Sequence, residues 1–316
     1  MYNHYFVSGE AIMKKYDSVI IGPVSLDINI DCEGVERREL GGAVVQSGYA
    51  AAKCGFSTLV LTKADRSDAD TEARFADSGA DLITLPSSQT CSIRNQYLTP
   101  DKERRICRSL GVCDPFTPLD LDVLKEREVS IVHLAGLVWG DFSDEVILEA
   151  GKYGKTAVDA QCLLRHVESD GSMAYHDWET KKKCLPYIDF FKVDAAEAEI
   201  LTGSADRKQA AAMLFDMGAK EVVLTHNTEV LVYDGSTYYT CPIKARNLSG
   251  RTGRGDTTFA GYLNSRIRCD IPEALLFATA LVSLKMETPG PFMQDREAVE
   301  NYIKEFYSDS PLMKER

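Results

Sequence analysis

The sequence predicts an α/β protein, a three-layer α/β/α sandwich in which helices cover both faces of a mostly parallel sheet. Short apolar runs rich in β-branched residues alternate along the chain with longer helical patterns. The runs lie at residues 17–22, 57–64, 130–136, 156–161, 189–195 and 221–226. Strands that are apolar on both faces are typical of a parallel sheet buried between helices. The composition, 44% hydrophobic and 27% charged over 316 residues, excludes a wholly disordered chain.

Two helical patterns near the N-terminus end at glycines, which commonly terminate helices because they adopt left-handed backbone angles. Residues 44–55 and 67–79 each predict such a helix. A second methionine stands at position 13, just before the first predicted strand. We therefore interpret residues 1–12 as an N-terminal extension and residues 13–316 as the folded domain.

Two segments interrupt the alternation of strands and helices, residues 27–40 and 91–108. Each alternates apolar and polar residues around a turn, at Gly34 in the first and at residues 99–102 in the second. Alternation with one polar face is typical of antiparallel strands rather than of core strands. We expect the two segments to form a small β-lid over a site. An exposed edge of that lid is a candidate surface for a homodimer.

The charge and the cysteines argue against several classes of protein. Lys and Arg number 36 and Asp and Glu 48, and the net charge of −12 argues against nucleic-acid binding but leaves room for a local basic pocket. The nine cysteines include no C-x-x-C pair, which favours free thiols in a reducing cytoplasm over a zinc site. No apolar run approaches the ~18 residues of a membrane span. We expect a cytoplasmic protein with a small-molecule substrate and no membrane or nucleic-acid partner.

The strongest local signal is the glycine-rich segment 249–263, where Gly250, Gly253 and Gly255 precede a helical pattern. Glycines permit a sharp turn and a close ligand, and the first turn of a helix presents unpaired amides and the positive end of its dipole. Together they make an anion hole suited to a phosphate group. Asp256 at the mouth of this hole does not suit passive phosphate binding, because a carboxylate repels a phosphate. Its position favours a role as the base that takes a proton from an attacking hydroxyl. The alternative is that Asp256 is a plain helix N-cap.

This segment resembles the second signature of the ribokinase, or PfkB-type, family of sugar and nucleoside kinases, which reads D-T-x-G-A-G-D before a helix. The matching residues are Thr252, Gly253, Gly255 and Asp256. The departures are Gly250 for the first Asp, Arg251 for the first Thr and Arg254 for the Ala. The resemblance implies a ribokinase-like fold and a catalytic set of Gly253, Arg254, Gly255 and Asp256, with Asp256 as the base.

Other landmarks of the family follow in the expected order. Asp27, after the first strand, resembles the Asp that grips substrate hydroxyls. Gly41, Gly42 and Gln46 resemble the G-G-x-x-x-N element that opens the first long helix, with Gln46 standing for Asn. These four residues are therefore the first candidates for binding the substrate.

The candidate cofactor-binding residues are Asp194, Glu197, Thr225 and Thr252. Asp194 and Glu197 resemble the N-x-x-E element of the family, and Glu197 matches the residue that handles magnesium, here expected through water. Residues 225–230 lie where a T-x-G-x-x-G nucleotide turn is expected, but both glycines are missing. Residues 285–291 lie near the region where the family has its adenine pocket.

Three further groups of residues have a functional and a structural interpretation. Arg165 follows a predicted strand, where α/β proteins bind ligands, and it is either a substrate contact or a surface arginine that opens the next helix. Arg94 and Arg104 on the lid either meet an anionic substrate or lie on a solvated strand face, which we favour. His133 lies in an apolar strand and is interpreted as structural.

The resemblance implies an enzyme that transfers the γ-phosphoryl group of ATP to a hydroxyl, with Mg2+ and, as a further candidate, a monovalent cation. A sugar or related polyol is the first acceptor we expect, with a nucleoside or an inositol as the alternative. Tyr97 is the one aromatic residue in 88–110, which favours a polyol because a nucleoside calls for aromatic stacking. A catalytically idle relative that binds a sugar or nucleotide and regulates a partner stays open, because Gln46, Asp194 and Gly250 depart from the pattern.

Overall fold

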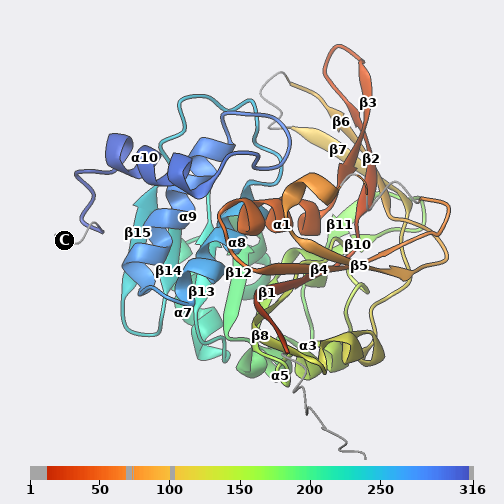
Figure 1. Ribbon diagram of the computed structural model, residues 1–316, viewed down its shortest axis with the longest axis horizontal. Coiled ribbons are helices and arrows are strands. Elements are labelled where there is room, and N and C mark those ends of the chain that lie inside the picture. The colour runs from red at the N-terminus through yellow and green to blue at the C-terminus, as the bar shows by residue number, and fades with distance from the viewer. Residues whose placement is uncertain (1–12, 69–72, 74, 100–103, 313–316) are drawn as a thin grey trace, which may run out of the picture.

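The fold is a three-layer sandwich with a small second sheet beside it (Figure 1). The residues that the computed structural model describes are 13–68, 73, 75–99 and 104–312. The predicted extension at residues 1–12 lies outside the described residues. So do parts of the predicted helix at 67–79 and of the predicted turn at 99–102.

Nine strands of the described chain form the central sheet, in the order β15-β14-β13-β12-β9-β8-β1-β4-β5. Their bounds are β1 Lys14–Ile21, β4 Thr58–Ala64, β5 Asp81–Pro86, β8 Arg127–Leu134, β9 Lys155–Asp159, β12 Phe190–Asp194, β13 Val222–Thr225, β14 Glu229–Tyr233 and β15 Tyr238–Pro242. The strands from β13 to β5 are parallel, as predicted. β14 and β15 add an antiparallel hairpin at one edge.

Helices cover both faces of this sheet, with α1, α8 and α9 on one face, α3, α6 and α7 on the other, and α10 packed on α9 (Figure 1). Their bounds are α1 Ala43–Lys53, α3 Asp144–Ala150, α6 Ala195–Thr202, α7 Arg207–Asp216, α8 Arg254–Arg266, α9 Ile271–Lys285 and α10 Arg296–Phe306. Successive residues of a strand point to opposite faces. Ile20 of β1 accordingly joins the apolar cluster that holds Val44 of α1, and Ile21 joins the cluster that holds Val146 of α3.

The two interrupting segments form a separate four-stranded sheet, in the order β3-β2-β6-β7, which we call the lid sheet. Its strands are β2 Ser25–Ile30, β3 Glu36–Gly41, β6 Ser92–Tyr97 and β7 Arg105–Gly111. The pairs β2–β3 and β6–β7 are antiparallel, as predicted, and β2 pairs with β6 in parallel. Gly34 lies in the first turn with a φ of 86°, a left-handed angle that glycine adopts without steric cost.

Short elements complete the described chain. They are β10 Arg165–Val167, β11 Met173–Tyr175, α4 Gln161–Leu164, α5 Lys181–Cys184, and the 3-10 helices η1 Ala76–Ser78, η2 Pro118–Leu124 and η3 Leu185–Tyr187. The predicted strand at 156–161 therefore ends earlier, at Asp159, and Gln161 begins a helical turn.

The sequence patterns did not predict β5, β14 or β15. β5 and β15 are the two edge strands of the central sheet and have no neighbouring strand on one side, whereas β14 lies between β13 and β15 in the antiparallel hairpin. β5 and β15 each begin and end with exposed residues, so their apolar runs are short and broken. Edge strands lack the continuous apolar pattern that identifies the buried strands.

All nine cysteines are free, as expected from their number and spacing. Among the helices that the structure describes, none is long and apolar enough to cross a bilayer.

His133 of β8 generates a prediction about acid stability. It is buried, edge-on to the Phe259 ring with 4.9 Å between the ring centroids, and burial lowers the pKa of His133 to about 3. Between that pH and about 6.5 the unfolded chain binds a proton that the folded chain does not, so stability falls as the pH falls. His133→Leu should remove about 2 kcal/mol of the loss in unfolding free energy between pH 7 and pH 5. Urea unfolding at both pH values measures this, and equal losses in both proteins would contradict a neutral buried histidine.

Candidate active site

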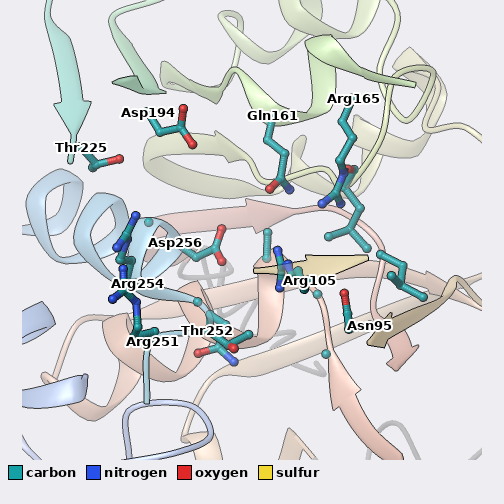
Figure 2. Close-up of a pocket in the computed structure, with 18 of the residues that line it drawn as sticks. Asn95, Arg105, Gln161, Arg165, Asp194, Thr225, Arg251, Thr252, Arg254 and Asp256 are labelled. Atoms are coloured by element: carbon teal, nitrogen blue, oxygen red, sulfur yellow. The ribbon is translucent and has the colours of Figure 1, made fainter. Parts of the chain in front are cut away.

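A cavity of about 410 Å³ opens where the carboxyl ends of the parallel strands meet the N-terminus of α8 and the lid sheet (Figure 2). This is the usual position of ligand sites in α/β proteins. All the candidate site residues from the sequence line it, namely Asp27, Gly41, Gly42, Gln46, Arg165, Asp194, Glu197, Thr225, Thr252, Gly253, Arg254, Gly255 and Asp256. Three lining residues that the sequence patterns did not point to are Asn95, Arg105 and Lys192.

The turn before α8 is shaped by Gly253, whose φ of 79° lies in the left-handed region. A Cβ atom at this position would also lie 2.3 Å from the Gln46 side chain of α1, so only glycine fits. The amides of Gly255 and Asp256 belong to the first turn of α8, where amides have no acceptor within the helix. The helix dipole adds positive potential at the same point, and the turn therefore has the geometry of an anion hole.

The packing around Gly250 explains why glycine replaces the first Asp of the kinase signature. Its amide donates to the carbonyl oxygen of Met286 at 2.7 Å, and a Cβ atom at position 250 would lie 1.9 Å from the carbonyl oxygen of Thr288. The loop therefore lies directly on the end of α9. No aspartate side chain fits there.

Asp256 is the third residue of α8, and its side chain points into the middle of the cavity (Figure 2). The N-cap of α8 is Gly253, and no side-chain hydrogen bond caps the helix, so the capping interpretation of Asp256 is wrong. Burial and the Asp159 carboxylate raise the pKa of Asp256 to about 6, against the effect of three nearby basic side chains. A carboxyl group with such a pKa can accept a proton near neutral pH.

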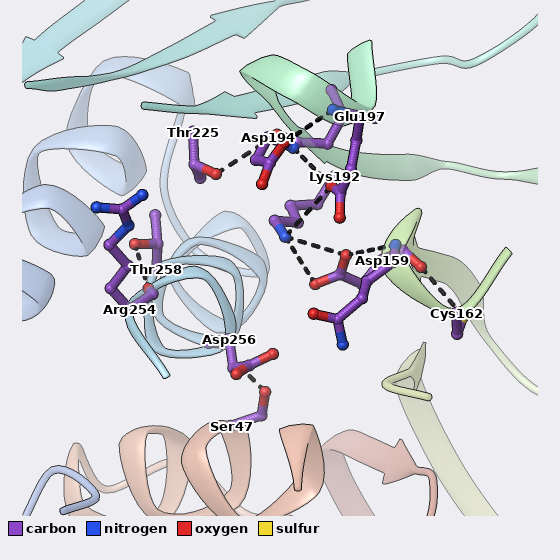
Figure 3. Close-up of polar contacts among 12 residues, drawn as sticks. Ser47, Asp159, Cys162, Lys192, Asp194, Glu197, Thr225, Arg254, Asp256 and Thr258 are labelled. Carbon is purple, nitrogen blue, oxygen red and sulfur yellow. Dashed lines mark hydrogen bonds and ion pairs between the residues drawn. The ribbon is translucent and has the colours of Figure 1, made fainter. Parts of the chain in front are cut away.

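Lys192 of β12 is almost completely buried against the cavity (Figure 3). Its ammonium group lies 3.0 Å from each carboxylate oxygen of Asp159 and 3.8 Å from Glu197. Burial opposes its charge, but the surrounding carboxylates outweigh this effect and raise the pKa of Lys192, which stays protonated. The ammonium also lies 3.2 Å from the position that a Cβ atom of Gly255 would take, so it sits beside the anion hole. In the sequence, the one indication of a role for Lys192 is that it interrupts an otherwise apolar run in β12.

Asp194 and Glu197 form a capping box at the start of α6 (Figure 3). The Glu197 amide donates to Asp194 Oδ1 at 2.8 Å, and the Asp194 amide donates to Glu197 Oε2 at 2.7 Å. Asp and Asn are both favourable N-caps, so Asp194 keeps the capping role that Asn would have. Burial raises the pKa of Glu197 to about 8, although Lys192 opposes the shift.

The lid end of the cavity is defined by polar side chains from the lid sheet and from the short elements α4 and β10 (Figure 2). These are Asp27, Asn95, Arg105, Gln161 and Arg165. Arg94 and Arg104 are exposed, as we favoured. Their neighbours Asn95, which is buried, and Arg105, which is exposed, line the cavity. Asn95 is held in place by a hydrogen bond from its amide to Asn29 Oδ1, at 3.1 Å.

Arg165 and Asp27 have opposite charges and interact electrostatically at the lid end of the cavity. Arg165 is 6% exposed, lies on β10 and donates from Nε to the Leu137 carbonyl oxygen at 2.8 Å, so the surface interpretation of this arginine is wrong. The Ser25 hydroxyl donates to Asp27 Oδ1 at 2.5 Å. Burial raises the pKa of Asp27, whereas the Ser25 hydrogen bond and the nearby Arg105 and Arg165 work in the opposite direction.

The arginine end of the cavity lies on the other side of Asp256 (Figure 2). It is defined by Thr225, Asn227, Arg251, Thr252 and Arg254. Arg251 donates to the Asn227 side chain at 3.3 Å. After Thr225 the chain turns tightly into β14, with a hydrogen bond from the His226 amide to the Glu229 carbonyl at 3.0 Å. This short hairpin stands where a glycine-containing nucleotide turn was expected.

One contact joins the lid sheet to the turn before α8. The Tyr97 hydroxyl of β6 lies 3.2 Å from the Thr252 hydroxyl. Tyr97 is buried, so this contact joins the lid sheet to the loop that leads into the anion hole.

The cavity carries more basic than acidic side chains, although the protein as a whole has a net charge of −12. The basic ones are Arg105, Arg165, Lys192, Arg251 and Arg254. The acidic ones are Asp27, Asp194, Glu197 and Asp256. This local reversal of charge suits an anionic ligand.

The carboxylates of Asp194 and Glu197 are the candidates for handling a metal. Within the described part of the chain, no group of three or more His, Cys, Asp or Glu side chains could hold a metal ion by itself. Mg2+ prefers oxygen ligands, keeps several waters and commonly shares the phosphates of its substrate. The pair therefore fits a magnesium ion that arrives with a phosphate-bearing ligand and is held through water.

Comparison with known proteins identifies relatives of the whole fold. The model of the pfkB family of carbohydrate kinases matches residues 36–293. A pyrophosphate-dependent kinase of the ribokinase family, solved with a pyrophosphate analogue and myo-inositol, is 35% identical, with a TM-score of 0.81 over 90% of this chain and 99% of that chain. A pyrophosphate-dependent myo-inositol-1 kinase converted by two substitutions into a myo-inositol-3 kinase is 34% identical, with the same TM-score over 92% of this chain and 99% of that chain.

Two further similarities are more limited. The ribokinase of Arabidopsis thaliana, solved with ribose and ATP, is 17% identical with a TM-score of 0.73 over 92% of this chain and 99% of that chain, which supports the fold alone. The cytidine kinase of Thermococcus kodakarensis is 44% identical over 70 residues, which span 21% of this chain and 25% of that protein.

The ion pair between Lys192 and Asp159 generates a prediction about stability. Lys192→Met should lower the free energy of unfolding by about 3–5 kcal/mol, because it leaves buried carboxylates without a counter-charge. Adding Asp159→Asn should restore about 1 kcal/mol or more of this loss. Urea unfolding of the two single variants and the double variant measures the coupling.

The pair Lys220 and Asp189, 2.9 Å apart with side chains 58% and 22% exposed, is the more exposed control. The corresponding cycle with Lys220→Met and Asp189→Asn should give a coupling of about 1 kcal/mol or less. Equal couplings in the two cycles would contradict the role of burial at Lys192.

Proposed function

Because the chain belongs to the pfkB family of carbohydrate kinases and is a phosphotransferase that acts on a hydroxyl group, we propose that it transfers a phosphoryl group from inorganic pyrophosphate to a hydroxyl of an inositol. Asp256 is the base in this proposal. The anion hole of Gly253, Gly255 and Asp256 holds the phosphoryl group in transfer. The donor occupies the arginine end and the acceptor the lid end.

The charge arrangement of the cavity carries the proposal. Pyrophosphate has no base or ribose, so its recognition requires cations and amide donors alone. The arginine end offers these through Arg251 and Arg254, with Lys192 beside the first-turn amides of α8. Arginine binds phosphate oxygens through paired N–H donors, which suits a small, highly charged anion.

The polar contacts at the end of α9 support a donor without a nucleobase. Arg246 donates from Nε to both carboxylate oxygens of Glu287 at 2.9 Å, and the Tyr302 hydroxyl donates to Glu287 at 2.8 Å. The Ser249 hydroxyl donates to the Glu287 carbonyl oxygen at 2.8 Å. Polar contacts thus join the segment before Gly250 to the region where the family has its adenine pocket. The cavity volume, about 410 Å³ for donor and acceptor together, is also at the low end for ligand sites.

The lid end supports a polyol acceptor. Asp27, Asn95 and Gln161 offer carboxylate and amide groups to several hydroxyls at once. The aromatic residue Tyr97, which lines the cavity, has its hydroxyl 3.2 Å from the Thr252 hydroxyl. A ring that carries a hydroxyl on every carbon satisfies this polar surface better than a nucleobase, which gains most from stacking.

The proposed reaction moves one proton and one phosphoryl group. The acceptor hydroxyl loses its proton to Asp256 as its oxygen forms a bond to a phosphorus atom of pyrophosphate. The bridging P–O bond breaks, and inorganic phosphate leaves with both electrons of that bond. The proton on Asp256 then passes to solvent or to the leaving phosphate. Catalysis of such a loose transfer depends mainly on positioning and on charge stabilisation.

The residues around Asp256 divide these tasks among themselves. The amides of Gly255 and Asp256 stabilise charge on the transferred phosphoryl oxygens. Lys192 neutralises charge between donor and acceptor, and Asp27 orients the acceptor. A magnesium ion that enters with the donor would be held by Asp194 and Glu197 through water and would neutralise further charge on the phosphates.

An ATP-dependent nucleoside kinase is the second candidate, favoured by the segment that is 44% identical to a cytidine kinase. In that case a nucleotide would enter from the arginine end and a nucleoside would occupy the lid end. An idle binding relative is the third, and the inward position of Asp256 without any capping role argues against it.

A panel of donors and acceptors tests the proposal. We expect turnover with Mg2+, pyrophosphate and an inositol, measured as release of phosphate and formation of an inositol phosphate. ATP, GTP and CTP should support little turnover with the same acceptor. Turnover of cytidine or ribose with ATP, and none with pyrophosphate, would overturn the proposal in favour of the second candidate.

Asp256→Asn should lower kcat by about 10²–10⁴-fold and leave the KM for the inositol nearly unchanged, because the amide keeps the shape but cannot accept the proton. Glu297→Gln is the matched control, since Glu297 is an exposed carboxylate in the first turn of α10. The control should keep full activity. An Asp256→Asn protein with unchanged kcat would exclude Asp256 as the base.

The pH dependence follows from the pKa of Asp256, about 6. The base must be ionised, so kcat/KM should fall tenfold per pH unit well below pH 6 and level off above it. The donor phosphates also titrate in this range. The residual activity of Asp256→Asn separates the two, because it should lack the limb that belongs to the carboxyl group. A limb that persists unchanged in the variant would assign the titration to the donor.

A further inference from the structure

Lys285 is a buried lysine whose role neither the signature nor the mechanism above explains. It is the last residue of α9, and 2% of its surface is exposed. Its ammonium group donates to the carbonyl oxygen of Gly250 at 2.7 Å and to that of Thr252. These two carbonyls flank Arg251, in the loop that leads into Gly253 and the anion hole.

The surroundings of this ammonium group are those of a bound monovalent cation. Backbone carbonyl oxygens replace the water around a compact single charge, and the C-terminal end of a helix adds negative potential. A buried charge is stable only where such groups compensate its lost hydration. The carbonyl oxygens of Gly250 and Thr252 provide that compensation for Lys285.

The position of Lys285 connects it to the reaction. Carbonyls 250 and 252 lie just before Gly253, so fixing them fixes the direction of the amides that follow. The ammonium also acts electrostatically on Asp256, which faces Asp159, Lys192 and Arg165 as well.

We propose that Lys285 is a built-in monovalent cation that holds the turn before α8 in its anion-binding shape, so that the enzyme needs no added potassium or ammonium ion. Lys285 is a positioning residue, since it acts through the turn. The role in catalysis rests on the proposed function, whereas the role as a built-in cation does not.

A small cavity beside the loop makes the proposal testable with free ions. It measures about 110 Å³, and Gly250 and Thr252 line it together with Ser249 and Gly290. Lys285→Ala would leave the carbonyls of Gly250 and Thr252 facing the space vacated by the ammonium group, next to this cavity. A free ammonium or potassium ion fits that position, whereas tetramethylammonium is too large.

The first arm of the experiment measures binding without any substrate. Melting temperatures are recorded at constant ionic strength in lithium, sodium, potassium, ammonium and tetramethylammonium chloride. Potassium and ammonium should raise the melting temperature of Lys285→Ala above its value in tetramethylammonium, and should leave the wild-type protein unchanged. Lys285→Met is the matched control, because its side chain fills the space with an uncharged group and should give no ion-specific shift.

The second arm measures turnover in the same salts. The wild-type rate should not depend on the cation. Lys285→Ala should lose about 10²-fold in kcat, with a small change in KM for the acceptor, because a misplaced turn affects the transition state most. Ammonium or potassium should restore most of that loss, and should not restore Lys285→Met.

Three results would overturn the proposal. The first is a wild-type enzyme that requires potassium. The second is a Lys285→Ala protein that keeps full activity in tetramethylammonium. The third is a Lys285→Ala protein that no ion stabilises, or that does not fold in any of the salts while Lys285→Met does. If no donor and acceptor give turnover at all, the proposed function fails, and the melting-temperature arm still decides the role of Lys285.

Discussion

The active site depends on keeping charges of both signs buried in contact with one another. Lys192 is the centre of this arrangement, because it binds Asp159 and approaches Glu197 while it lies beside the first turn of α8. Carboxylates at this depth would be neutral without a cation near them. Lys192, together with Lys285 and Arg165, therefore favours the ionised form of Asp256, the residue that we propose as the base.

Local sequence patterns predicted the parts of the site that local geometry determines. Gly253 and Asp256 were found because a glycine-rich turn followed by a helix is a contiguous feature. Asp194 and Glu197 were found by their resemblance to the N-x-x-E element, which also lies within four residues of the chain. Asn95 and Arg105 were missed because the inward face of a lid strand depends on its register in the folded sheet. Lys192 was missed because nothing in an apolar strand reveals which carboxylates will surround a lysine. The same limit applies to Gly250, whose neighbour Thr288 is distant in sequence.

The sequence patterns predicted the centre of the main sheet better than its edges. Continuous apolar runs identified the central strands, since both of their faces are buried. The edge strands β5 and β15 carry mixed patterns. β14 was missed although its three central residues are buried, because its apolar run is short. The helix α1 was recognised from its periodicity and its terminal glycine. The structure also shows how the two lid segments associate. β2 pairs with β6, which joins two hairpins from separate parts of the chain into one sheet.

The lid sheet and the main domain line different parts of the same cavity. Asn95 and Arg105 line the lid end of the cavity from strands that contribute nothing to the central sheet. In the function that we propose, substitutions at these two positions change which hydroxyl of the acceptor faces Asp256 and leave the turn before α8 unchanged. Related proteins with this fold can therefore differ in substrate preference while the residues proposed for phosphoryl transfer stay the same.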